Sequence, residues 1–138
     1  MSDPATLHTL LDRLEVPWEE GAREGETVVT LPGEHKLRTV VSLHVGKRAL
    51  ELRAFVIRNP DERHGDVHRF LLRRSLRLPG LGYAVDAAGD VYVTARVPLA
   101  GLDEQTVDEL LGGVLAACDE PFDELLRIGF WTSIRREW

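Results

Sequence analysis

The stretch "KLRTVVSLHVGKRALELRAFVI", residues 36–57, decides the fold. Apolar and polar residues alternate in each half, which is the period of two expected of a half-buried strand. Gly46 and Lys47 between the halves suit a two-residue hairpin turn with glycine first. The stretch therefore predicts two antiparallel strands. Their predicted core faces are Leu37, Thr39, Val41, Leu43 and Val45, and then Leu50, Leu52, Ala54 and Val56.

The flanking sequence predicts the remaining elements. Leucines at positions 7, 10, 11 and 14 have helical spacing and predict a first helix that ends before Pro17. "TVVTLPG", residues 27–33, predicts a strand, and residues 82–99 predict a second hairpin that turns at residues 87–90. A helix that starts near Asp103 and Glu104 is broken or restarted by Pro121, and a last segment follows it.

This order of elements, α-β-β-β-α-β-β-α, predicts an α+β fold. Strands that are joined by short turns pair antiparallel, so we expect an antiparallel β-sheet of about five strands with helices packed on one face. A chain of 138 residues can bury a core of its own. We expect residues 1–138 to form a single domain.

Composition excludes several classes of function. The net charge of -6 opposes binding to a nucleic-acid backbone. The chain has no apolar run of membrane-spanning length and no leader pattern at its start. Its one cysteine can form no intramolecular disulfide, which agrees with a reducing compartment. We therefore expect a cytoplasmic protein that binds neither nucleic acid nor membrane.

The segment "RNPDERHGDVHRFLLRRS", residues 58–75, contains two histidines four residues apart. Asn59, Pro60 and Glu62 suit a helix start, with Asn59 as cap. A helical projection turns His64 and His68 toward the sheet, together with Val67, Leu71, Leu72, Leu76 and Leu78. A zinc site needs at least three protein ligands, so we expect packed histidines and no metal. The alternative is a small metal-dependent protein or enzyme that uses His64 and His68.

The opposite face of the same predicted helix is rich in arginine. Arg69, Arg73 and Arg77 share it with Phe70, and Arg63 and Arg74 flank them. We expect a solvated face. The alternative is a surface for a protein partner that is centred on Phe70 and Arg73, because an exposed aromatic residue among arginines is typical of interface anchors.

No catalytic or cofactor motif is present. Cys118 lies among apolar residues at helical spacing, which predicts a buried and unreactive thiol, and no pair of carboxylates suits acid–base chemistry. We therefore expect no enzyme activity and no cofactor.

Two further sets of apolar residues are candidates for partner binding. Phe130, Ile134 and Trp138 have helical spacing and lie next to Trp131; they are predicted to dock on the protein's own core or to form a dimer contact. Val40, Phe55 and Ile57 fall opposite the predicted core stripe of their strands, which indicates an exposed apolar patch.

Four stretches, taken together and in order, resemble the YbjN-domain family of bacterial proteins. They are "VVTLPGEHKLRTVVSLHVG", "FVIRNPDERHGDVHRFLLRR", "GDVYVTARVPLAGL" and "GFWTSIRREW". The resemblance implies a fold similar to that of type III secretion chaperones, which are small, acidic, non-enzymatic proteins that usually form homodimers and bind partner segments in extended form. It therefore implies a chaperone-like or regulatory protein that binds a protein or peptide partner.

Overall fold

The computed structural model describes residues 4–136. In chain order the elements are α1 (Pro4–Arg13), β1 (Glu19–Glu20), β2 (Glu26–Pro32), β3 (Arg38–Val45), β4 (Ala49–Ile57), α2 (His64–Ser75), β5 (Leu81–Val85), β6 (Val91–Pro98), the 3-10 turn η1 (Leu99–Gly101), α3 (Glu104–Asp119), α4 (Phe122–Gly129) and α5 (Trp131–Arg136).

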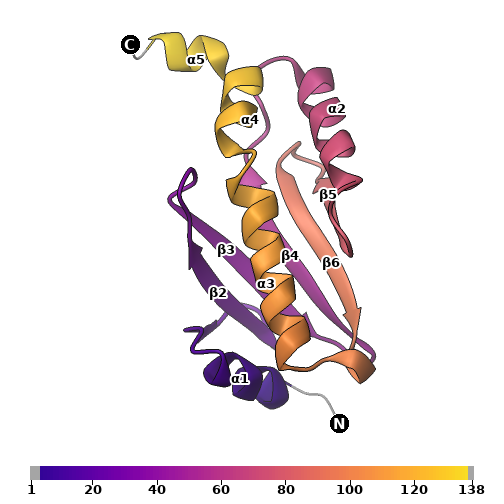
Figure 1. Cartoon of the computed structure of the whole chain (residues 1–138). Helices are drawn as coiled ribbons and strands as arrows, with labels where there is room; N and C mark the ends of the chain where they lie inside the picture. The colour runs from indigo at the N-terminus through magenta and orange to yellow at the C-terminus, as the bar shows by residue number, and fades with distance from the viewer. Residues whose placement is uncertain (1–3, 137–138) are drawn as a thin grey trace.

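The strands form one antiparallel sheet in the order β1-β2-β3-β4-β6-β5. Helix α3 runs along one face of the sheet, with α1 beside it at one end and α4 at the other (Figure 1). The predicted α+β fold, an antiparallel sheet with helices on one face, is confirmed. A sixth strand is added by β1, whose two residues are too short to show a periodic pattern.

The hairpin of β3 and β4 has the predicted core faces. Thr39, Val41 and Leu43 of β3 are buried, and so are all four residues predicted for β4. The turn is displaced by one residue, because the Gly46 N–H donates to the Ala49 carbonyl at 2.9 Å and leaves Lys47 and Arg48 as the loop. Leu37 is 84% exposed, contrary to the prediction, because it precedes β3 and lies in the connection from β2.

Helix α2 begins later than predicted. It starts at His64, and its N-cap residue Arg63 has the left-handed φ of 52° and forms no side-chain cap hydrogen bond. The predicted cap, Asn59, instead donates its backbone N–H to Asp90 Oδ1 in the turn between β5 and β6, at 2.8 Å. The prediction that Asn59 caps the helix is therefore wrong: Arg63 is the N-cap residue, and Glu62, which would reach back to Asn59 in a capping box, accepts the N–H of Thr132 instead.

The buried face of α2 is also rotated from the predicted one. Val67 and Leu71 are buried and Phe70 packs partly against the core, whereas Leu72 and Leu76 are 68% and 90% exposed. His64 is exposed and His68 is half-buried. The sequence offers two neighbouring apolar arcs, and the contacts of α2 with α4 and β5 cover only one of them.

Helix α3 follows the prediction closely. Asp103 caps it by accepting the Thr106 N–H at 2.8 Å, and Val107, Leu111, Val114 and Cys118 are buried. The chain then breaks at Pro121, as predicted, and breaks again at Phe130. Phe130 and Ile134 consequently do not lie on one continuous helix. Trp138 lies outside the described residues.

Candidate partner-binding groove

Strands β3 and β4 separate at one end of the sheet. Their pairing runs from Val45 opposite Leu50 to Val41 opposite Ala54. Beyond that point β3 continues with β2, and β4 continues with β6. Figure 1 shows the closed end of the β2–β3 hairpin lying apart from β4. In the described chain, one edge of β4 at residues 55–57 therefore has no neighbouring strand.

A groove of about 450 Å³ lies beside this free edge and runs under α4 and α5. We call it the partner groove. Its lining is mainly apolar and, in the part of the chain that the structure describes, includes no carboxylate. The lining residues are Phe55, Val56, Ile57, Phe122, Leu126, Phe130 and Ile134, with Lys36, Arg58 and Ser133.

Four of the predicted partner-binding residues meet in this groove: Phe55, Ile57, Phe130 and Ile134. Phe55 is 37% exposed, as predicted, but Ile57 is only 4% exposed. The register of β4 against β6 shifts between Phe55 and Ile57, so Val56 and Ile57 are both buried. An irregularity of this kind breaks the alternation of side chains, which is why the prediction that Ile57 is exposed is wrong.

Lys36 carries a positive charge into the groove from the β2–β3 connection. Its Nζ donates to the Phe55 carbonyl at 2.9 Å and lies 5.4 Å from the centroid of the Phe55 ring. Burial lowers the pKa of this ammonium. Among residues 4–136, no carboxylate lies within ion-pair distance of Lys36 Nζ.

The backbone of Lys36 is held by a buried carboxylate. Asp119, at the end of α3, accepts the N–H groups of His35 and Lys36 on one oxygen, at 2.9 and 2.8 Å. These backbone hydrogen bonds, with that of Lys36 first, hold the pKa of Asp119 below its ordinary value. Gly33 lies against the same carboxylate, since a Cβ at this position would clash with Asp119 Oδ1. The connection is thereby fixed to α3.

Arg58 provides the second positive charge of the groove, but this charge is already compensated. It lies 4.5 Å from the centroid of the Phe130 ring, and two of its nitrogens donate to Asp61 at 2.7 and 3.3 Å. Arg58 and then the Ser133 hydroxyl lower the pKa of Asp61 to about 2. Glu62 accepts the Thr132 N–H at 3.0 Å. The loop before α2 thus anchors α5, the helix that closes the groove.

The remaining predicted partner-binding residues lie elsewhere. Val40 is 43% exposed on the bare face of the sheet, and Trp131 is 46% exposed at the start of α5. Arg73 is exposed on α2, and Phe70 is half-buried rather than solvated. Arg74, predicted to be solvated, is half-buried, and it donates to Tyr83 and Glu120 at 3.4 Å. That these residues bind a partner stays a prediction.

The structure brings no third ligand to the histidine pair. No group of three or more histidine, cysteine, aspartate or glutamate residues that could hold a metal occurs within residues 4–136. Cys118 is buried, and its burial raises the pKa of the thiol to about 12. No helix between residues 4 and 136 is long and apolar enough to cross a membrane.

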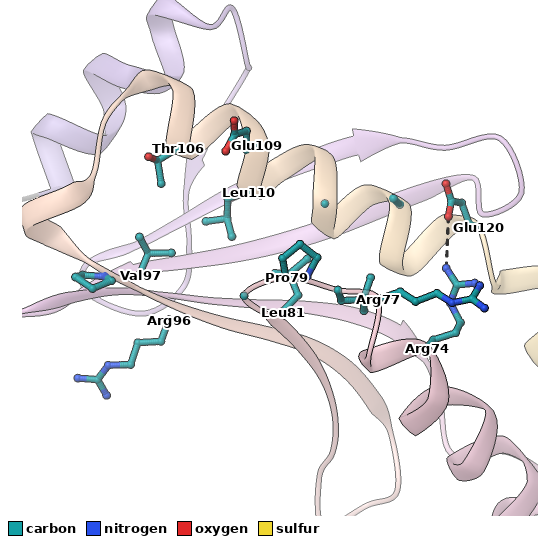
Figure 2. A pocket seen from close by; sticks show the side chains of 15 residues that line it. Arg74, Arg77, Pro79, Leu81, Arg96, Val97, Thr106, Glu109, Leu110 and Glu120 are labelled. Carbon is teal, nitrogen blue, oxygen red and sulfur yellow. Dashed lines mark hydrogen bonds and ion pairs between the residues drawn. The ribbon is translucent and has the colours of Figure 1, made fainter.

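A second cavity, of about 580 Å³, lies between α3 and the strands β5 and β6 (Figure 2). Leu110 of α3 and Val97 of β6 lie on opposite sides of it, and Arg74 pairs with Glu120 at 3.4 Å at its α2 end. Small residues, Gly80, Gly113 and Ala116, leave the space open. None of the predicted partner-binding residues lines this cavity, and its two glutamates and three arginines favour no one class of ligand.

The sequence predictions missed Lys36, Phe122 and Leu126 as members of the partner groove. A signal for two of them is present, because Phe122, Leu126, Phe130 and Ile134 repeat at intervals of four residues. Lys36 carries no comparable signal, since its place in the groove depends on contacts with Phe55 and Asp119, which are distant in the sequence.

Known structures share this arrangement of sheet and helices. A chain in the crystal structure of the ExsC–ExsE complex matches with a TM-score of 0.63 at 18% identity, over 91% of this chain and 97% of that one. The HopA1–SchA chaperone–effector complex contains a chain with a TM-score of 0.63 at 16% identity, over 87% of this chain and 91% of that one. The fold is that of the type III secretion chaperones.

Sequence comparison identifies the family of the chain. The family model YbjN, described as "Putative bacterial sensory transduction regulator", matches residues 3–127. The chain belongs to the YbjN family. The uncharacterized protein Rv0487 of Mycobacterium tuberculosis is 47% identical over 111 residues, which are 80% of this chain and 61% of that protein. The chain thus spans about three-fifths of the length of the curated relatives that it matches.

Proposed function

We propose that this protein is a non-enzymatic, chaperone-like or regulatory protein of the cytoplasm that binds an extended segment of a partner protein in the partner groove, and that it does so as a homodimer. The observation that carries the proposal is the position of an apolar groove next to an unpaired strand edge. An extended peptide can hydrogen-bond to such an edge while alternate side chains enter apolar pockets. The groove volume of about 450 Å³ is enough for one or two large apolar side chains.

The use of the carboxylates supports a role without catalysis. Asp103 caps α3, Asp119 binds the β2–β3 connection, and Asp61 and Glu62 hold Arg58 and α5. The pKa of each of these four groups is lowered, which favours the charged form that makes the contacts. A general acid that works near neutral pH needs a raised pKa instead.

The outward face of α2 supports the homodimer. Leu72 and Leu76 are among the most exposed large apolar side chains of the described chain; Leu72 lies in the last turn of α2, and Leu76 is its C-cap residue. Exposed leucines at this spacing, with Arg69 and Arg73 beside them, suit an apolar interface core with a polar rim. The second copy would then lie on the side of α2 that faces away from the sheet.

A synthetic peptide with blocked ends tests the groove, whatever the identity of the natural partner. The probe is the octapeptide Thr-Val-Gln-Phe-Ile-Val-Thr-Ser, and its binding is measured by isothermal titration calorimetry. Phe55→Ser removes an apolar wall of the groove, and Val85→Ser is the matched control, an exposed valine on β5 at the other edge of the sheet. We expect binding that is about tenfold weaker in Phe55→Ser, since burial of a large apolar side chain contributes about 1.5–3 kcal/mol, and unchanged in Val85→Ser. Equal binding by the wild type and Phe55→Ser refutes the groove.

The dimer is tested separately, by light scattering on protein at micromolar concentration. We expect a dimer for the wild type and a monomer for the double variant Leu72→Glu/Leu76→Glu, because charges cannot be buried without partners in an apolar interface. Circular dichroism verifies that the variant is folded. A wild-type monomer refutes the homodimer and leaves the groove untouched.

A further inference from the structure

The charge of the partner groove indicates which peptides it would select, an inference that rests on the proposed function. Among residues 4–136, Arg58 and Lys36 are the two cations that line the groove, and no carboxylate lines it. Asp61 neutralises Arg58 through two hydrogen bonds, at 2.7 and 3.3 Å. Nearby, Asp123 is paired with His35 at 2.9 Å. Of these two lining cations, Lys36 is the one without an ion pair among residues 4–136.

The hydrogen bonding of Lys36 is likewise incomplete. An ammonium group has three donors, and in the described chain Nζ has one acceptor, the Phe55 carbonyl. The side chain is half-buried, so its charge is partly removed from water. A half-buried cation with free donors gains most from an anionic acceptor, because charge-assisted hydrogen bonds are about twice as strong as neutral ones.

Lys36 cannot easily turn away from the groove. The two hydrogen bonds to Asp119 fix its backbone, and the Phe55 carbonyl and ring hold its end. Nζ is therefore placed at the point where the free edge of β4 meets the apolar lining. An acidic group bound there would lie directly beside a side chain that enters between Phe55 and Phe130.

We propose that the partner groove selects extended segments in which a carboxylate side chain adjoins a large apolar residue, with Lys36 Nζ binding the carboxylate. The occupant is a peptide rather than a free fatty acid. The Phe55 carbonyl on this edge already accepts a hydrogen bond from Lys36 Nζ. An aliphatic chain could add no hydrogen bond along the rest of the edge, whereas a peptide backbone can.

Two blocked octapeptides test this selection: Thr-Val-Glu-Phe-Ile-Val-Thr-Ser, whose one carboxylate is the glutamate side chain, and its glutamine counterpart. We expect wild-type protein to bind the glutamate peptide about tenfold more tightly in calorimetry. Lys36→Met keeps most of the apolar stem and should abolish this preference. Lys47 is exposed in the turn at the far end of β3, so Lys47→Met is the matched control and should retain the preference for the glutamate peptide.

The chain contains only two lysines, Lys36 and Lys47, so a carbodiimide that joins amines to carboxylates gives a direct second readout. Mass spectrometry should find the glutamate peptide coupled at Lys36 and not at Lys47. Equal affinity for the two peptides, with both weakened by Phe55→Ser, overturns the selection and leaves the groove in place. Failure of both peptides to bind overturns the proposed function as well. A third outcome is that decanoate binds and the glutamate peptide does not, and that Lys36→Met abolishes the binding of decanoate. This result would assign the site to a free amphipathic acid and overturn the proposal that its occupant is a peptide.

Discussion

Replacement of Asp119 by alanine should destabilise the protein more than most surface substitutions do. One carboxylate oxygen accepts two backbone N–H groups, from His35 at 2.9 Å and Lys36 at 2.8 Å, and the residue is only 7% exposed. A hydrogen bond to a charged group contributes about 1.5–3 kcal/mol. Part of this is regained, because water can reach the freed groups in an exposed loop. We therefore expect the free energy of unfolding to fall by about 2–4 kcal/mol.

The assay is urea unfolding followed by tryptophan fluorescence, with linear extrapolation to water. Asp119→Asn is the matched variant: it keeps one acceptor oxygen and loses the charge, so we expect a fall of about 1 kcal/mol. The pKa of Asp119 is lowered in the folded state, so its contribution is present above the ordinary pKa of 3.8 and lost as pH falls through the folded value. An Asp119→Ala protein within about 0.5 kcal/mol of the wild type, which is the spread of neutral surface changes, would refute the view that this carboxylate anchors the connection.

Two further predictions concern Gly33 and Asp61. Gly33→Ala places a Cβ against the Lys36 carbonyl oxygen, so the free energy of unfolding should fall by about 1–3 kcal/mol. The control is Gly112→Ala, whose Cβ meets nothing within 4 Å inside α3, and its free energy of unfolding should rise by about 0.5–1 kcal/mol. Urea unfolding measures both, and the opposite order would contradict the structure. Arg58 holds the pKa of Asp61 at about 2, below the ordinary 3.8. The stability that this pair contributes is therefore fully present above about pH 4 and is lost as the pH falls through about 2. Asp61→Asn should flatten that part of the curve of stability against pH, and an unchanged curve would contradict the ion pair.

Much of the fold was predictable because strand and helix patterns depend on local geometry. The alternation in β3 and β4 identified their buried residues, since successive side chains of a strand point to opposite faces. The start of α3 was equally local, because the cap residue Asp103 accepts the N–H of Thr106, only three residues along the chain. The start of α2 was not, because distant residues hold the loop before it: the Asn59 N–H donates to Asp90 Oδ1, 31 residues along the chain.

The sequence alone was enough to predict the antiparallel sheet, its core face and four of the apolar residues that line the partner groove, namely Phe55, Ile57, Phe130 and Ile134. Only the tertiary structure decided which of them meet. The register shift after Phe55 buries Ile57, and the separation of β3 from β4 opens the edge beside it. Lys36 enters the groove because Asp119, 83 residues later, holds its backbone. Such contacts join segments that no periodic pattern relates, because their geometry is set by how separate elements pack rather than by the local chain.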